Sequence, residues 1–368
     1  MNFDTSRYTE LKDTFEAWWR HELKRPIIQV SLDKDTPKGG DYFATNYRRD
    51  ILNAMYDFDI APEKVAEIVD KAYDGVEYLG DAIPVFYMRP TGVLGGMLGE
   101  GYKINHEQGT IWFEQMVDDI SEIKGIRFDE KNPLVQRALS LTKAVQDRFD
   151  GNIALGIPDF GGVMDIAAAI RDSCPFCMDL ISEEDEAMAA CENIHEQFNK
   201  AYELFVKCID KDRIPGYSCW ATMLSQEMYF VLQNDFSAMI GSEMYDDFYL
   251  PILKEECRMI PRTFYHLDGP DAVRHLDSIL TVEELNGVQW VNGAGSAPLD
   301  HWDEIYKKVI GAGKLLQVFI TGKEELKYID YIAETVGTTE GLCFICTGKT
   351  DEEDYYKEYL RKYGLRDD

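Results

Sequence analysis

Four short apolar segments recur at nearly constant intervals in the C-terminal half of the chain, and this spacing is the strongest constraint on its fold. The segments begin near Thr263, Gly287, Leu315 and Gly341, so that the intervals are 24, 28 and 26 residues. A pattern typical of an amphipathic helix fills each interval. Alternation of strands and helices at such a period is typical of parallel βα units. We therefore expect an α/β protein.

The N-terminal half carries a looser version of the same alternation. Residues 26–32 (PIIQVSL) and 153–157 have the apolar pattern of buried strands, and residues 132–149 have helical spacing of their apolar side chains. A length of 368 residues fits one barrel with insertions, and no linker or low-complexity segment divides the chain. The sequence predicts a single (β/α)8 TIM-type barrel domain over residues 1–368, with helical additions at its N-terminus.

The composition excludes several classes of partner. The chain has 38 Lys and Arg against 67 Asp and Glu, a formal net charge of −29, whereas nucleic acids and anionic membranes attract positive surfaces. No apolar run approaches the roughly 18 residues of a membrane span, and the N-terminus lacks the pattern of a secretory signal. The eight cysteines are then expected to be reduced thiols. We expect a cytoplasmic protein, and whether it forms a homodimer is left open.

Catalytic groups in barrels of this kind lie at the carboxyl ends of the strands. This rule selects His266 and Asp268 after one regular segment, Cys346 after the last, and Asp159 in the less regular half. Two residues apart on a strand, His266 and Asp268 point to one face, where they could share a Zn²⁺ ion or a proton. A hydrogen-bonded pair that caps the next helix is the alternative. Cys343 faces the opposite way from Cys346, and about 165 residues separate CFIC from the other pair, CPFC at 174–177, so the two pairs do not form a compact zinc motif.

Three segments together resemble the uroporphyrinogen decarboxylase superfamily. They are YHLDGPDAVRHLDSILTVEELNGVQWVNGAG at 265–295, LQNDFSAMIGSEMYDDFYLPILKE at 232–255 and GIPDFGGVMDIAAAIRD at 156–172. The resemblance covers most of the chain, best from about residue 150 onward, and it too implies a (β/α)8 barrel. The superfamily contains cofactor-free decarboxylases of uroporphyrinogen. It also contains enzymes that transfer methyl groups to or from a corrinoid protein or a thiol, usually with Zn²⁺.

The chain is more similar to the corrinoid-dependent methyltransferases than to the decarboxylases. The decarboxylases carry an arginine-rich N-terminal motif of the type RQAGR, and here the corresponding strand reads RPIIQVSLDKD. A polyanionic porphyrinogen would also require an electropositive cleft, which a net charge of −29 disfavours. The methyltransferase branch implies zinc held by His-x-Cys and a last-strand Cys. In this chain His266, Asp268 and Cys346 stand at those positions, a harder set of ligands that suits polarisation of an ether or alcohol oxygen.

The expected function is methyl transfer between a small methylated compound and a corrinoid protein, with a cobalamin-type cofactor carried by that partner. O-demethylation of a methoxy arene is one such reaction, because aromatic side chains near the strand ends could line its pocket. The expected catalytic residues are His266, Asp268, Asp235 and Asp159, and the expected substrate-binding residues are Trp220, Tyr229, Trp290 and Asn292. One alternative is a decarboxylase or other lyase that uses Asp159, Asp235 or His266 as acid or base. Another is a non-catalytic binding barrel.

Overall fold

A mainly parallel sheet forms the centre of the computed structural model, which describes residues 1, 3–33, 46–99, 101–105, 110–293 and 295–367. Its seven strands follow the order β2–β1–β11–β10–β9–β8–β7. Their bounds are Ile27–Asp33 for β1, Val76–Gly80 for β2, Tyr229–Gln233 for β7, Arg262–Asp268 for β8, Gly287–Val291 for β9, Leu315–Thr321 for β10 and Leu342–Lys349 for β11. Neighbouring strands run parallel, except that β2 is antiparallel to β1.

Two short strand pairs complete the described sheets. Val85–Phe86 (β3) pairs in parallel with Ala154–Leu155 (β6), and Tyr102–Asn105 (β4) pairs antiparallel with Thr110–Phe113 (β5). An isolated parallel bridge joins Leu155 to Tyr217. The expected α/β class with parallel strands is therefore confirmed. Among the described residues the hydrogen bonds define three sheets, and they do not by themselves define a closed barrel.

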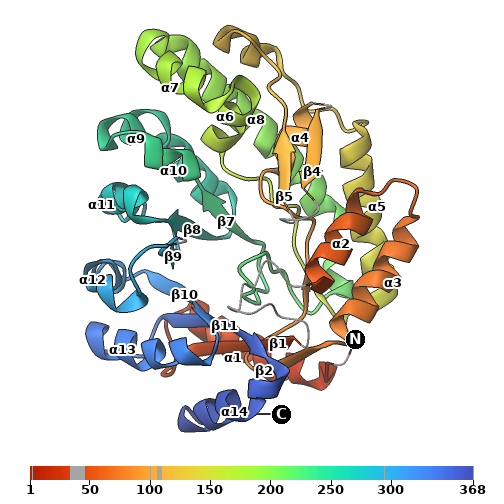
Figure 1. Ribbon diagram of the computed structural model, residues 1–368, viewed down its shortest axis with the longest axis vertical. Coiled ribbons are helices and arrows are strands. Elements are labelled where there is room, and N and C mark those ends of the chain that lie inside the picture. Colours follow the sequence, from red (N-terminus) through yellow and green to blue (C-terminus); the bar gives the residue numbers. More distant parts are fainter. Residues whose placement is uncertain (2, 34–45, 100, 106–109, 294, 368) are drawn as a thin grey trace.

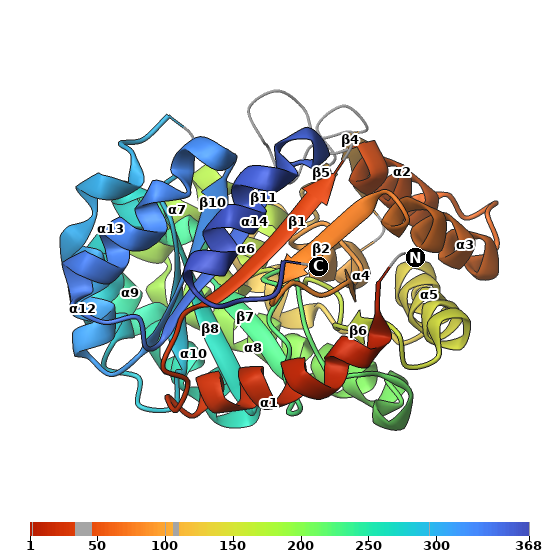
Figure 2. The ribbon, with the colours of Figure 1, turned by 90° about the horizontal axis from the view of Figure 1, so that it is seen from below.

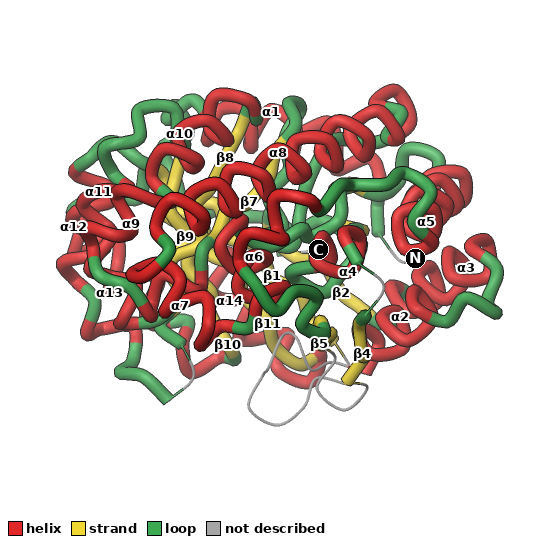
Figure 3. Tube along the Cα trace, turned by 90° about the horizontal axis from the view of Figure 1, so that it is seen from above, coloured by secondary structure: helices red, strands yellow, loops and turns green. Residues whose placement is uncertain are grey.

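Helices cover the outer side of the curved main sheet. In Figure 1, α9 to α14 lie outside the row of strands from β7 to β11, and Figure 3 shows the strands enclosed by helices. The helices are α1 Tyr8–Trp19, α2 Asn46–Tyr56, α3 Pro62–Tyr73, α4 Val93–Leu98, α5 Pro133–Phe149, α6 Val163–Arg171, α7 Ser173–Ser182, α8 Glu184–Cys208, α9 Ser242–Phe248, α10 Leu250–Met259, α11 Leu276–Ile279, α12 Asp303–Gly311, α13 Lys327–Val336 and α14 Glu353–Lys362. In the described ranges, no helix has the length and apolar character needed to cross a lipid bilayer.

Side chains alternate between two sides of the main sheet. On β8, Tyr265 and Leu267 belong to the hydrophobic cluster shared with the surrounding helices, whereas Phe264 packs with α1 on the opposite side. We call these the helix-facing side and the inner side. His266 and Asp268 have the same phase as Phe264 along the strand, so they lie on the inner side.

Helix α1 covers the amino ends of the strands, as Figure 2 shows. The indole N–H of Trp18 donates to the carbonyl of Leu342 at the start of β11, and its ring stacks on Phe264. Glu16 accepts two hydrogen bonds of 2.6 Å from Arg262, the first residue of β8. These contacts place α1 across the end of the sheet opposite to the carboxyl ends.

Candidate active site

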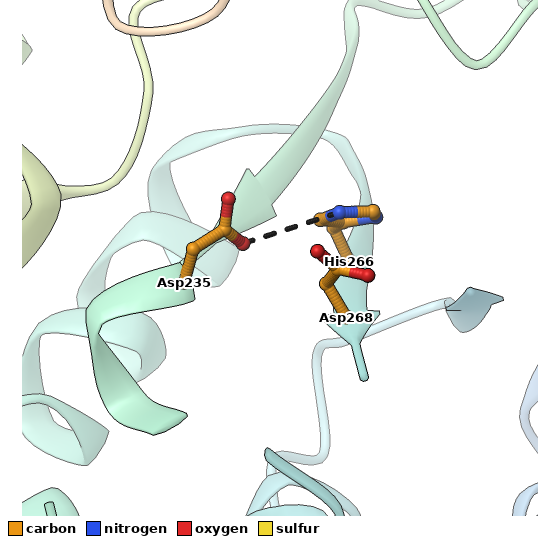
Figure 4. Close-up of side chains that lie close together, drawn as sticks. All are labelled: Asp235, His266 and Asp268. Carbon is orange, nitrogen blue, oxygen red and sulfur yellow. Dashed lines mark ion pairs between the residues drawn. The ribbon is translucent and has the colours of Figure 1, made fainter. Parts of the chain in front are cut away.

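Asp235, His266 and Asp268 form a compact group at the carboxyl ends of β7 and β8 (Figure 4). One potential ligand atom of each residue lies within 4.8 Å of those of the other two, and His266 Nε2 is 4.0 Å from Asp235 Oδ1. His266 and Asp268 come from the end of β8, where both point to the inner side. Asp235 begins the 3₁₀ helix η5 (Asp235–Met239) that follows β7. The His266 side chain is 12% exposed and that of Asp235 is 49% exposed, so the group can be reached from solvent.

The imidazole of His266 is held on two sides. Its Nδ1 lies 2.7 Å from Oε1 of Gln289 on β9, and the ring of Trp220 meets it edge to face with centroids 4.9 Å apart. Burial lowers the pKa of His266, and the nearby Asp268 carboxylate and the Gln289 hydrogen bond oppose this effect. A neutral ring that donates from Nδ1 to Gln289 has its lone pair on Nε2, the atom that faces Asp235.

A third carboxylate, Asp165, fixes the backbone that carries Asp235. It lies in the first turn of α6 and accepts the N–H groups of Asp235 at 3.2 Å and Phe236 at 2.7 Å. Burial raises the pKa of Asp165, and these backbone hydrogen bonds oppose the shift. The α6 turn packs tightly here, because a Cβ on Gly162 would lie 2.1 Å from the carbonyl oxygen of Gln233. Sequence reasoning missed Asp165, although GGVMD has the form of a glycine followed three residues later by a capping acid.

Asp159 lies beside the group on the segment after β6. Its Oδ2 accepts a 2.7 Å hydrogen bond from the Thr91 hydroxyl, and its Oδ1 has no hydrogen-bond partner within the described part of the chain. Burial raises the pKa of Asp159 to about 6, while the Thr91 hydrogen bond and the charges of His266 and Arg89 oppose the rise. Asp159 is thus a buried, protonatable carboxyl that interacts electrostatically with His266, and it lies outside the group of three.

The carboxylates around Asp235 concentrate negative charge. Loss of hydration raises the pKa of Asp235 well above its ordinary value, and repulsion from Asp165, Asp268 and Asp159 adds to the rise. Carboxylates this close together are stabilised by a proton or by a cation. The arrangement can therefore hold a divalent metal ion on two carboxylates and one imidazole, or a shared proton.

The structure corrects the predicted position of three residues. Cys346 and Trp290 belong to the hydrophobic cluster on the helix-facing side, so Cys346 is not part of the acidic group, and Asp235 takes its place. Tyr229 is the first residue of β7, at the amino end, where its ring packs on Trp19 of α1. The rule of strand ends misplaced them because it considers neither the direction in which a side chain points nor the exact strand bounds.

The other two predicted substrate-binding residues lie at the expected end of the sheet. Trp220 is 6% exposed and contacts the His266 ring, while its indole N–H has no hydrogen-bond partner in the described residues. Asn292 directly follows β9 and donates from Nδ2 to the carbonyl of Ala297 at 2.9 Å, which braces its loop. Of the two, Trp220 is therefore the residue that contacts the group of three.

The fold has a solved counterpart. It is similar to that of a methyltransferase from Methanosarcina mazei, with a TM-score of 0.58 over 92% of each chain and 13% sequence identity. At this identity the similarity concerns the fold. No protein-family model matches the sequence, and no curated protein matches it.

Proposed function

We propose that this chain is a methyltransferase of the corrinoid-dependent, uroporphyrinogen-decarboxylase-like kind. The observation that carries the proposal is the Asp235–His266–Asp268 group at the carboxyl ends of parallel strands. The similarity in fold to a methyltransferase supports it. In this proposal the sheets are arcs of one (β/α)8 barrel. The bridge between Leu155 and Tyr217 extends the arc of β3 and β6 toward β7. The reaction moves a methyl group from a small O- or N-methylated compound to the cobalt of a corrinoid carried by a partner protein.

The donor atoms of the group fit a divalent ion such as Zn²⁺. Two ligands that each lie about 2.1 Å from a tetrahedral Zn²⁺ are roughly 3.4 Å apart. The 4.0 Å between His266 and Asp235 would therefore shorten by about 0.6 Å, and the span of up to 4.8 Å within the group by no more than about 1.4 Å. Two carboxylates and an imidazole form a hard set of ligands. When bound, the ion would act as a Lewis acid on the heteroatom that loses the methyl group.

The surrounding residues supply what the leaving atom needs. A methyl group on oxygen or nitrogen leaves only when that atom gains a proton or an equivalent positive partner. For a methoxy compound the balanced reaction is R–O–CH₃ + Co(I) + H⁺ → R–OH + CH₃–Co(III). In this proposal Asp159, which is buried and accepts a hydrogen bond from Thr91, carries that proton. Trp220 offers an apolar face next to the same imidazole.

The proposal is tested with reduced cobalamin, free or protein-bound, and a panel of methoxy arenes and methylamines. We expect methylcob(III)alamin to form, visible as a change in the absorption spectrum of the corrinoid. His266→Ala should lower the rate by at least about 100-fold, the scale of a lost catalytic group. The matched control is His301→Ala, because His301 is an exposed histidine that pairs with Asp300 away from the group.

Two results would contradict the proposal. Decarboxylation of uroporphyrinogen at an enzymatic rate, with no methylation of cobalamin by any donor, would favour the lyase alternative. An equal loss of rate in His266→Ala and His301→Ala would show that the acidic group does not perform the reaction.

A further inference from the structure

A row of polar side chains crosses the inner side of the main sheet from the His266 imidazole. Oε1 of Gln289 on β9 lies 2.7 Å from His266 Nδ1, and Gln289 Nε2 donates over 2.5 Å to Oε1 of Gln317 on β10. Gln317 Nε2 in turn donates to the sulfur of Cys343 on β11 at 3.7 Å. The strand register places each pair side by side, His266 opposite Gln289, Gln289 opposite Gln317 and Gln317 opposite Cys343.

Burial of the polar groups in this row costs free energy of desolvation, which their hydrogen bonds must offset. Gln289, Gln317 and Cys343 are each 0% exposed. A buried amide that loses a partner is penalised by the desolvation of its polar atoms, and apolar side chains of similar volume avoid that risk. Interior strand positions in this kind of fold are commonly filled by branched apolar residues. Packing alone therefore does not explain two adjacent glutamines.

The row has a direction, because each amide has one acceptor end and one donor end. Gln289 presents its NH₂ group to Gln317, so its carbonyl oxygen faces His266. That oxygen can only accept, so the proton of the imidazole is placed on Nδ1. The lone pair is then on Nε2, the atom that faces Asp235.

The contacts of Cys343 agree with this direction. In the reversed row, the carbonyl of Gln317 would face the sulfur and depend on a thiol S–H, which is a weak donor. In the observed row the sulfur is an acceptor, and it also receives Nε2 of Gln29 from β1 at 3.8 Å. Amide donors thus approach the sulfur from both neighbouring strands. A reversed row would put the imidazole proton on Nε2, where it would block a metal ion.

We propose that Gln289, Gln317 and Cys343 are positioning residues that hold His266 in the Nδ1–H tautomer, so that Nε2 is free to act as a ligand. The inference rests on the proposed function in assigning that lone pair to a metal ion, although the tautomer itself does not depend on metal. Gln317 is the key residue: it does not touch the imidazole, yet it decides which end of Gln289 does. A partner that fixes the ring of a ligating histidine typically changes metal affinity by about 10- to 100-fold.

The first experiment reads the tautomer in metal-free protein. ¹⁵N chemical shifts of the imidazoles separate Nδ1–H from Nε2–H rings, and the His266→Ala variant identifies the signal among the 6 histidines. We expect the Nδ1–H form in the wild type and a mixture of tautomers in Gln317→Met, which keeps the side-chain volume. The control is Gln197→Met, because Gln197 is an equally buried amide on α8 that bonds to Asn193 and Phe128 instead.

The second experiment measures Zn²⁺ binding by calorimetry in the same proteins. Gln289→Met and Gln317→Met should each weaken binding by about 10- to 100-fold, while Gln197→Met should not change it. Gln289→Glu, which can only accept from Nδ1, should have the wild-type tautomer and bind Zn²⁺ at least as well as the wild type does. This variant also keeps the test decisive if a Met variant fails to fold.

The outcomes separate the two proposals. An Nε2–H tautomer in the wild type, or an unchanged tautomer in Gln317→Met, would overturn the role of the row. Absence of Zn²⁺ binding by a wild type that has the Nδ1–H tautomer would contradict the proposed metal site and leave the role of the row intact.

Discussion

At the residue scale, Asp165 serves the candidate site by binding backbone. It accepts N–H groups from Asp235 and Phe236, which lie about 70 residues further along the chain. His266 and Asp268 are predictable from the sequence because they stand two residues apart on one strand and therefore share a face, and Asp235 is among the predicted acids or bases. Asp165 is not predictable in this way, because its hydrogen bonds to a distant backbone leave only a local capping pattern in the sequence.

Asp165→Asn is expected to weaken the site without unfolding the chain. One carboxylate oxygen would become an NH₂ group facing backbone N–H donors, so Asp235 would lose its position. Zn²⁺ binding should weaken by about 10-fold or more, on the scale of lost supporting hydrogen bonds. The matched control is Asp172→Asn, because Asp172 also accepts a backbone N–H, that of Cys174 at the start of α7. Equal affinities in the two variants would contradict the role of Asp165.

At the element scale, the apolar strands were predictable and the segments between them less so. β8 to β11 begin within one residue of their predicted starts, because a buried parallel strand needs a continuous apolar run. The helix expected between the segments that begin near Thr263 and Gly287 is instead a 3₁₀ turn, Pro270–His275 (η6), followed by the four-residue α11. His275 is fully buried there, stacks on Tyr245 and bonds to the carbonyl of Ser237. Such tertiary contacts are not visible in apolar spacing.

Helix α10 carries a buried acid, Glu256, that should make stability depend on pH. Burial raises the pKa of Glu256 to about 8 from an ordinary 4.5, against the opposing hydrogen bond of Tyr249. Between these values the folded chain keeps a proton that the unfolded chain releases. The resulting stabilisation is complete below about pH 4.5 and declines by about 1.4 kcal/mol per pH unit until about pH 8.

Glu256→Gln should remove this dependence. The Tm of the variant should fall less than that of the wild type between about pH 5 and pH 8, and near pH 8 the variant should be the more stable protein. Glu243→Gln, at an exposed position in the first turn of α9, is the control. Parallel Tm profiles for the wild type and Glu256→Gln would show that Glu256 does not hold the proton.

At the scale of the whole molecule, the site is an acidic group in a chain of net charge −29. The direction of the parallel strands brings Asp235, His266 and Asp268 together at one end. The apolar segments alone predict this for His266 and Asp268 but not for Asp235, because the predicted strands do not include β7. The side of the sheet on which Cys346 and Trp290 lie could not be inferred, because it depends on the phase of each strand. The core has no need of a metal ion, since two extended hydrophobic clusters hold the helices and α1 to the sheet.

Removal of metal should therefore leave the fold intact. Protein treated with a chelator is expected to keep its circular dichroism spectrum, and Zn²⁺ at 100 times its Kd should stabilise it by about 2.7 kcal/mol, seen as a higher Tm. Asp235→Ala should abolish most of that increase, while Asp271→Ala, an exposed acid on η6, should not. Unfolding by the chelator would contradict this prediction.

Helix α1 closes the amino end of the strands with Trp18 and Trp19, so reactants approach the acidic group from the carboxyl side. In the proposed reaction a small methyl donor and a large corrinoid protein share that approach. The large partner would obstruct the path of the small one once it docked. Turnover should consequently follow a compulsory order, in which the donor binds before the corrinoid protein and the demethylated product departs after it. Initial-rate patterns with a dead-end analogue of the donor would show this order, as inhibition competitive with the donor and noncompetitive with the corrinoid protein.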